Sequence, residues 1–197
     1  MCIRDRIKPK EIPLESSPCK ENILKENEIY LLDFPFLKTN PGDNGQYINT
    51  GSVILQDEEL GRNVGTYRCQ IKDKKKIGIN PQINQDGWKF LKKLREQGKK
   101  FANAAIVLGT DPITFSLSGS KVANYGEDEL EIAGGLMGEA IEIVECETND
   151  IYVPAHAELI IEGEIPLNQF ESEGPFGEMY GYLCLLYTSP SPRDAIP

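Results

Sequence analysis

Histidine is nearly absent from this sequence of 197 residues, because His156 is the only one. A metal centre built from several histidines is therefore excluded. The five cysteines have no CxxC spacing and form no dense framework, which favours reduced thiols in a cytosolic setting. No apolar run approaches the roughly 20 residues that a membrane-spanning helix needs, and the first residues lack the pattern of a secretory signal.

Basic residues are also scarce: 21 Lys and Arg stand against 31 Asp and Glu, which gives a formal charge of -10. This charge has the wrong sign for non-specific binding to nucleic acid or to an anionic membrane, so neither is expected as a partner. With 40% hydrophobic residues, the chain can bury a core as one domain or two small ones. Disorder is excluded.

Familiar catalytic and nucleotide-binding motifs are missing. The sequence has no GxGxxG, GxxxxGK[ST], HExxH or GxSxG. The glycine-rich run at 134–138 ends a helical pattern and lacks the strand–turn–helix context of a phosphate loop, so it indicates close packing. His156 has no GxSxG nucleophile to serve in a triad, and we expect it at the surface or in a strand.

The two ends are predicted to be foreign to the protein. DNA that encodes residues 1–6 has a reverse complement which, read one base in, encodes residues 184–188. Complementary flanks of this kind are typical of a sequencing adapter translated together with its insert. We therefore leave residues 1–6 and 184–197 out of the fold prediction; the alternative for the C-terminal end is a proline-containing disordered tail.

The remaining pattern predicts an α+β domain. Residues 7–27 are polar and proline-containing, which favours a linker or the end of an upstream domain, so folded structure is expected over 28–183. One helix is expected from Asn84 or Asp86 to about Lys99 and another over 127–137. Strands are expected at 29–34, 47–55, 66–73, 77–80, 101–108, 140–146 and 159–165. Many strands with two helices between them suggest a barrel-like α+β fold.

Two polar segments stand out against this background. Residues 63–68 place Asn63 and Arg68 on either side of a glycine, and Arg68 lies on the polar face of an alternating strand. Residues 173–178 place Glu173 and Glu178 around a stiff Gly-Pro turn. Each also has a purely structural explanation, because a strand arginine is often paired structurally and loop glutamates are often solvated.

Six ordered motifs complete the sequence evidence. They read PCKE at 18–21, DNGQYI at 43–48, NVGTYRCQ at 63–70, LGTDP at 108–112, VPAHAE at 153–158 with EG at 162–163, and EGPFGEMYGY at 173–182. Together they resemble the UbiD family of prenylated-flavin decarboxylases, along essentially the whole interior. The resemblance implies the central flavin-binding domain, a split β-barrel related to flavin reductases with flanking helices. From the resemblance we expect that the family's first domain and its C-terminal oligomerising domain are mostly absent from the sequence.

The resemblance also implies a cofactor site. In the family, prenylated FMN is held through its phosphate by Mn²⁺ or Mg²⁺, with K⁺ nearby, and hard oxygen ligands suit such cations. Asn63 and Glu129 match two metal ligands, although Glu129 is equally explained as an acid at a helix N-terminus. Asn84 stands at the position of the family's histidine ligand and is equally explained as a helix N-cap. The implied cofactor-binding residues are Asn63, Val64, Gly65, Thr66, Tyr67, Arg68, Asn84 and Glu129.

The implied catalytic residues are Arg68, Glu173 and Glu178, which match the family's Glu-Arg-Glu network. In the family's scheme the substrate joins the prenylated flavin and loses CO₂ into it, and Glu178 supplies the proton to the vacated carbon. The expected substrate is an aromatic or α,β-unsaturated carboxylic acid. A flavin prenyltransferase is the expected cofactor supplier, and the full-length protein is expected to be a homo-oligomer. The alternatives are a flavin-binding split-barrel protein without decarboxylase activity and an inactive fragment.

Overall fold

The computed structural model describes residues 5–177 and 182–184. The chain divides into two compact units, each of which is described separately. The first unit comprises the described parts of 1–23, 50–66 and 90–167, and the second those of 24–49, 67–89 and 168–197. The chain therefore passes between the units several times, once within the short stretch from Thr66 to Tyr67.

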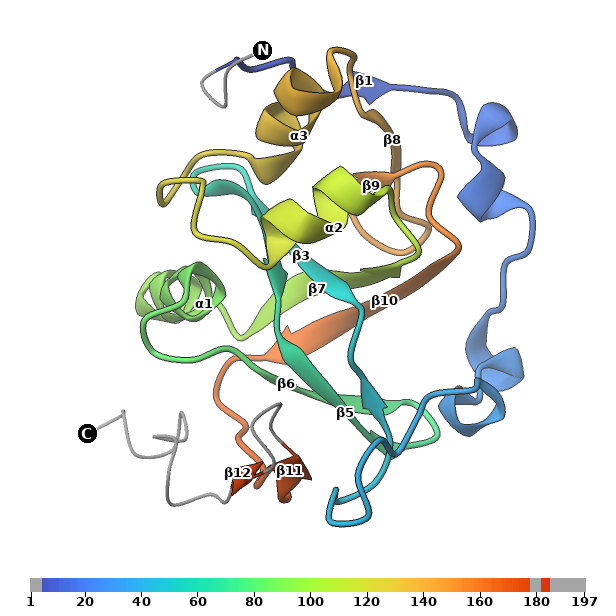
Figure 1. Ribbon diagram of the computed structural model, residues 1–197, viewed down its shortest axis with the longest axis vertical. Coiled ribbons are helices and arrows are strands. Elements are labelled where there is room, and N and C mark those ends of the chain that lie inside the picture. Colours follow the sequence, from blue (N-terminus) through green and yellow to red (C-terminus); the bar gives the residue numbers. More distant parts are fainter. Residues whose placement is uncertain (1–4, 178–181, 185–197) are drawn as a thin grey trace. The chain divides into compact units, whose positions relative to one another are not determined.

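The first unit is built on a four-stranded antiparallel sheet (Figure 1). Its strand order is β10-β7-β3-β4, with β10 at Leu159–Pro166, β7 at Phe101–Leu108, β3 at Ser52–Asp57 and β4 at Gly61–Thr66. Strands β7 and β10 pair along their whole length. A tight turn joins β3 to β4, which pair from Ser52↔Thr66 to Asp57↔Gly61.

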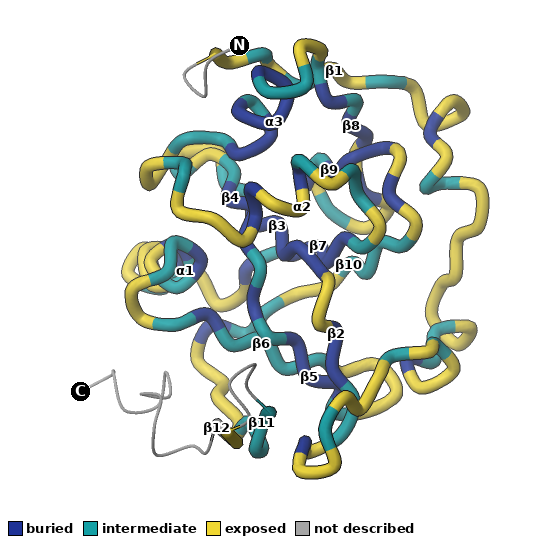
Figure 2. The backbone as a smooth tube through the Cα atoms, in the orientation of Figure 1, coloured by how far each residue is buried: buried dark blue, intermediate teal, exposed yellow. Residues whose placement is uncertain are grey.

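The centre of this sheet is buried on both faces, as Figure 2 shows for β3 and β7. Ile54 and Ala105 are paired and belong to one core cluster, while their neighbours Val53 and Ile106 are paired and buried as well. Successive side chains of a strand point to opposite faces. The near-continuous apolar run of β7 is therefore the pattern of a strand covered on both sides.

A small sheet and two helices complete the first unit. Strand β1 (Lys10–Glu11) pairs in parallel with β8 (Glu142–Glu145), which pairs with β9 (Tyr152–Pro154). Helices α2 (Pro112–Ser118) and α3 (Glu129–Met137) pack together and both contact β4. In α3, a Cβ atom at Gly134 would lie 2.9 Å from the backbone oxygen of Ile7, which supports close packing as the role of the glycine-rich run.

The second unit contains two small sheets. Strands β2 (Tyr47–Ile48), β5 (Arg68–Asp73) and β6 (Lys76–Asn80) form one, and β11 (Phe176–Gly177) and β12 (Leu183–Cys184) form the other. Helix α1 (Asp86–Glu96) begins in this unit and ends in the first. The chain also contains four short 3₁₀ helices, η1 (Leu14–Ser16) and η2 (Pro18–Lys20) in the first unit and η3 (Glu26–Glu28) and η4 (Leu31–Asp33) in the second.

The expected α+β class is confirmed, with strands at 101–108 and 159–165 and a helix in the 127–137 region. The strand predicted at 29–34 is wrong, because η4 occupies it, and the strand predicted at 47–55 is interrupted between β2 and β3. Residues 7–27, expected as a linker or the end of an upstream domain, contain β1, η1 and η2. The sheets of the described residues are open, so the split barrel stays a prediction.

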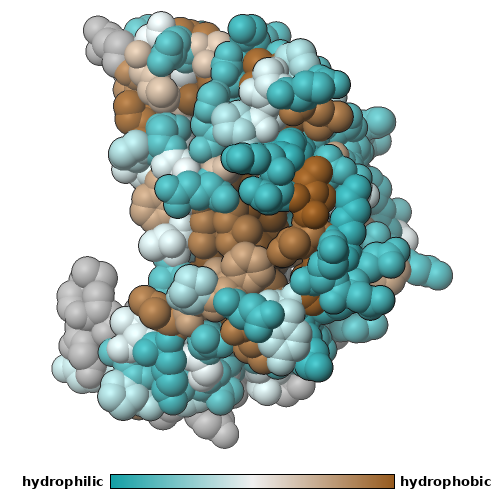
Figure 3. Space-filling view, turned by 90° about the vertical axis from the view of Figure 1, so that its right-hand side faces the viewer, coloured by the Kyte–Doolittle hydropathy of each residue, from teal (hydrophilic) through white to brown (hydrophobic). Residues whose placement is uncertain are grey.

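The surface of the described chain exposes several large apolar side chains. Leu37 is 66% exposed, Leu24 52% and Phe101 51%. Figure 3 shows apolar side chains gathered in the middle of one face with hydrophilic side chains around them. Within the described residues, no helix combines the length and apolar character that crossing a bilayer requires.

Replacing the N-cap of α2 tests the local basis of that helix. The Asp111 side chain accepts hydrogen bonds from the backbone N–H groups of Ile113 and Thr114, at 3.0 and 2.9 Å. Asp111→Ala removes both and should lower the free energy of unfolding by about 1 kcal/mol, measured by urea denaturation. Asp111→Ser, which keeps a capping oxygen, should recover most of the loss; equal stability of the alanine variant and wild type would contradict this role.

Candidate functional site

Two predicted metal ligands meet in the first unit. Asn63 lies on β4 and Glu129 is the first residue of α3, and each is 8% exposed. The Asn63 amide donates to Glu129 Oε1 at 3.4 Å, and the backbone N–H of Val64 donates to Glu129 Oε2 at 2.9 Å. Because α3 contacts β4, residues 66 positions apart in the chain form one buried pair of oxygen-bearing side chains.

An ion pair beside them fixes the start of α3. Asp128 is the N-cap of α3, where its Oδ1 accepts from the backbone N–H of Leu130. Its Oδ2 accepts from Arg62 Nη1 at 2.9 Å. Burial raises the pKa of Asp128, and the nearby Arg62 guanidinium opposes that rise. Two consecutive residues of β4, Arg62 and Asn63, therefore contact the N-cap and the first residue of α3.

A second cluster lies in the second unit, around Arg68. Arg68 Nη2 donates to Glu173 Oε2 at 3.0 Å, with side chains 21% and 16% exposed. The guanidinium carbon also lies 5.2 Å from the centroid of the Phe176 ring, which is a cation–π contact. Arg68 on the β5 hairpin thus contacts a segment more than 100 residues further along the chain.

Asn80 joins this cluster from β6, directly opposite Arg68 in the strand register. Its side-chain amide donates to Glu173 Oε2, the oxygen that Arg68 also contacts. Glu173 Oε1 is buried and has no hydrogen-bond partner among the described residues. One carboxylate oxygen therefore accepts from two side chains, and the other stays open as an acceptor.

The segment that carries Glu173 is held at several points. Asp43 is buried, and its carboxylate accepts from the backbone N–H groups of Asn40 at 2.8 Å and Gly177 at 2.7 Å. The backbone N–H of Asn44 donates to the Pro175 carbonyl at 2.9 Å. The Tyr47 and Phe176 rings meet edge to face with centroids 4.7 Å apart. These contacts fix Glu173 in the second unit before any ligand is considered.

The remaining predicted site residues have varied surroundings. Val64 and Gly65 are buried in β4, and Thr66 at its end is half-buried. Tyr67 is buried, and its hydroxyl accepts from the backbone N–H of Gly87 at 2.9 Å.

The structure joins Asn63 with Glu129, and Arg68 with Glu173, but these pairs belong to different units. Asn84 is exposed in the turn before α1, which begins at Asp86. Glu178 lies outside the described residues.

The sequence analysis missed Asn80 and Arg62. Counting from the hairpin turn would not have found Asn80, because the β5–β6 pairing shifts register between Ile71 and Asp73, and this shift places Asn80 opposite Arg68. No sequence signal paired Arg62 with Asp128.

The donor chemistry of the first cluster fits a hard divalent cation. No group of three or more His, Cys, Asp or Glu side chains in the described part of the chain could hold a metal ion. Asn63 and Glu129 nevertheless offer an amide oxygen and a carboxylate, which are ligands that Mn²⁺ and Mg²⁺ accept. A metal here would need further oxygen ligands, such as the phosphate of a cofactor.

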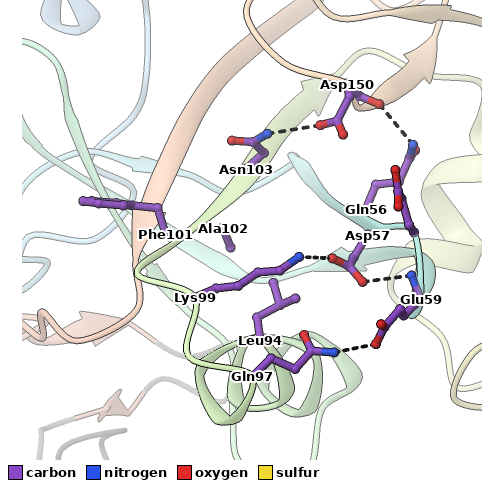
Figure 4. Close-up of a pocket in the computed structure, with 11 residues that line it drawn as sticks. Gln56, Asp57, Glu59, Leu94, Gln97, Lys99, Phe101, Ala102, Asn103 and Asp150 are labelled. Atoms are coloured by element: carbon purple, nitrogen blue, oxygen red, sulfur yellow. Dashed lines mark hydrogen bonds and ion pairs between the residues drawn. The ribbon is translucent and has the colours of Figure 1, made fainter.

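A separate cavity of about 590 Å³ lies in the first unit (Figure 4). Its polar side chains are paired with one another: Gln97 donates to Glu59 at 2.7 Å, Asn103 donates to Asp150 at 3.1 Å, and Lys99 pairs with Asp57. None of the predicted site residues lines this cavity. The candidate site is therefore not located there.

Comparison with known proteins decides the family. The family model described as UbiD, 3-octaprenyl-4-hydroxybenzoate carboxy-lyase Rift-related domain, matches residues 10–192. The chain belongs to the UbiD family. Ferulic acid decarboxylase 1 of Saccharomyces cerevisiae is 34% identical over 94% of this UbiD-family chain and 39% of its own length. Phenolic acid decarboxylase of Bacillus subtilis is 37% identical over 85% of this chain and 36% of its own length.

Solved structures agree with this assignment. The UbiD-class enzyme HmfF from Pelotomaculum thermopropionicum, in complex with FMN, superposes with a TM-score of 0.85 at 35% identity, over 92% of this chain and 40% of that chain. Vanillic acid decarboxylase of Sedimentibacter hydroxybenzoicus in its closed form gives 0.84 at 33% identity, over 91% and 39%. This UbiD-family chain thus spans well under half the length of these relatives.

The burial of Cys69 predicts that its thiol is unreactive near neutral pH. Burial raises the pKa of Cys69 to about 12, and the charge of nearby Glu173 acts in the same direction. At pH 8 only about one thiol in ten thousand would then be ionised, so iodoacetamide should leave Cys69 unmodified in the folded protein. Peptide mass spectrometry measures this. Urea-unfolded protein, the control, should be modified readily, and rapid native modification at pH 8 would contradict the buried position.

Proposed function

We propose that this chain is the flavin-binding part of a decarboxylase that removes CO₂ from an aromatic or α,β-unsaturated carboxylic acid with prenylated FMN. The observation that carries the proposal is the Arg68–Glu173 ion pair with its open, buried Glu173 oxygen, in a chain of the UbiD family. The names of its relatives support it, since they include ferulic, phenolic and vanillic acid decarboxylases. Two similar structures are complexes with FMN and prFMN.

In this proposal Asn63 and Glu129 hold a Mn²⁺ or Mg²⁺ ion that binds the cofactor phosphate. A metal lets an acidic protein hold a phosphate group, which its net charge would otherwise repel. Residues 63–68 line the cofactor, and Asn84 takes the place of a histidine ligand. An asparagine oxygen can coordinate a hard cation but supplies no imidazole nitrogen.

Arg68 and Glu173 place the bound acid, and Glu178 donates the proton that takes the position of the lost carboxylate. The guanidinium holds Glu173 through a charge-assisted hydrogen bond. Prenylated FMN, when bound, supplies an electron sink for the electrons left by departing CO₂. The protein's own contribution is placement of the substrate and delivery of the proton.

Several finer features belong to the same proposal. The domain is of the split-barrel type, K⁺ binds near the divalent metal, and a flavin prenyltransferase supplies the cofactor. The full-length protein is a cytosolic homo-oligomer; one similar structure is an evolved dimeric form of HmfF. The three free thiols of the described residues are consistent with a reducing environment.

The isolated chain is proposed to be inactive. It spans 36–39% of the decarboxylases described above, and exposed apolar side chains such as Leu37, Leu24 and Phe101 suggest surfaces that a longer chain would cover. Residues 1–6 and 184–197 are proposed to be adapter sequence and contribute nothing to function.

Expression of the full-length gene together with a flavin prenyltransferase tests the proposal. The purified protein should carry a prenylated flavin, detected by absorbance and mass spectrometry, and should release CO₂ from cinnamic or hydroxybenzoic acids. Protein produced without the prenyltransferase is the control and should release none. A soluble, folded protein that binds no flavin would overturn the proposal.

Glu178→Gln tests the proton donor in that full-length protein. Loss of the proton donor should lower the decarboxylation rate about 10²- to 10⁴-fold, because the amide cannot supply the proton, while bound flavin stays unchanged by absorbance. Glu171→Gln is the matched control: Glu171 belongs to the same segment but pairs with Lys76 at the surface. Continued turnover by the Glu178 variant would show that the assignment is wrong.

A further inference from the structure

Glu173 has an asymmetric environment in the second unit. Arg68 Nη2 and Asn80 Nδ2 both donate to Oε2, whereas Oε1 is buried and accepts from no described residue. A buried carboxylate oxygen without a partner is costly, so such groups in native proteins require an explanation. Here the open oxygen lies on a residue that already has a charged partner. No residue of the described ranges 5–177 and 182–184 supplies the missing donor.

A single arginine would restrict the carboxylate less. The terminal torsion of a glutamate is broad, and a carboxylate that accepts from one guanidinium alone can turn about that hydrogen bond. A second donor that reaches the same oxygen from a different strand fixes the plane of the carboxylate, so that the other oxygen points in one direction.

The fold delivers the two donors together. Arg68 and Asn80 are directly paired in the β5–β6 register, so one hairpin carries both side chains to the same oxygen. The same strand β6 carries Lys76, which pairs with Glu171 two residues before Glu173. This pair is exposed at the surface, where ion pairs contribute little, and Lys76 does not contact the Glu173 carboxylate.

We propose that Asn80 is a positioning residue which, with Arg68, fixes the Glu173 carboxylate so that Oε1 is presented to an N–H or O–H donor of the bound reactants. The inference rests on the proposed function for the identity of those reactants. It deepens that function by adding a third side chain to the arrangement around Glu173. In this role Asn80 acts through its contact with Glu173 and not on a reacting atom.

Asn80→Leu tests this in the full-length protein, because it keeps the approximate shape and removes the donor. It should lower kcat about tenfold to hundredfold, since small misplacements of a reacting group cost this much, with KM and FMN affinity changed less than twofold. Asn80→Gln keeps the amide donor and should recover part of kcat. Lys76→Met, the matched control, should leave kcat unchanged.

A crystal structure of the unliganded Asn80→Leu protein gives a readout that does not depend on turnover. Without the Asn80 donor, the Glu173 carboxylate should lose its single orientation. This would be seen as a changed terminal torsion of Glu173 or as two side-chain conformers. An unchanged carboxylate overturns the inference. So does a wild-type kcat in the leucine variant, or an equal loss in Lys76→Met. If wild type releases no CO₂, the proposed function fails, while the crystal structure still decides the role of Asn80.

Discussion

The ion pair between Arg68 and Glu173 is the interaction on which the arrangement of the second cluster, and with it the proposed function, depends. Taking two charges out of water is costly, and their attraction offsets that cost only when further hydrogen bonds satisfy them. Asn80 supplies one such bond and the Phe176 ring contacts the guanidinium. The pair also joins a hairpin to a segment that Asp43 anchors. Without Arg68, the half-buried Glu173 carboxylate would lose its charged partner and would lie near the buried thiol of Cys69.

Much of the fold was predictable, for identifiable reasons. The apolar run of β7 and the acid-led helix α3 carry strong local patterns, and both were predicted. The strand expected at 29–34 failed because a short apolar run does not distinguish a strand from other buried segments. Helix α2 was missed although Asp111 and Pro112 form an N-cap followed by proline at the first helical position. Its seven residues are too short to establish a helical period.

The candidate site was predictable in a different way. Asn63 and Glu129 came from the family resemblance and not from spacing, since residues 66 positions apart carry no local signal of contact. The structure adds what a motif cannot: Glu129 accepts from the Asn63 side chain and the Val64 backbone. Asn80 was not within reach of register counting along the hairpin, because an irregularity between Ile71 and Asp73 shifts the pairing. The open oxygen of Glu173 depends on several side-chain orientations at once, and no sequence pattern specifies those.

Two neighbouring side-chain contacts join β4 to the start of α3: Arg62 with Asp128, and Asn63 with Glu129. They limit where β4 and the turn before it can accept insertions and deletions. A one-residue slip of β4 would reverse the faces of its side chains and could bring the Arg62 guanidinium to the place that the Asn63 amide now takes opposite Glu129. The register of β4 against β3 is therefore constrained. Homologues that lengthen this turn should do so by additions that leave the strand register intact.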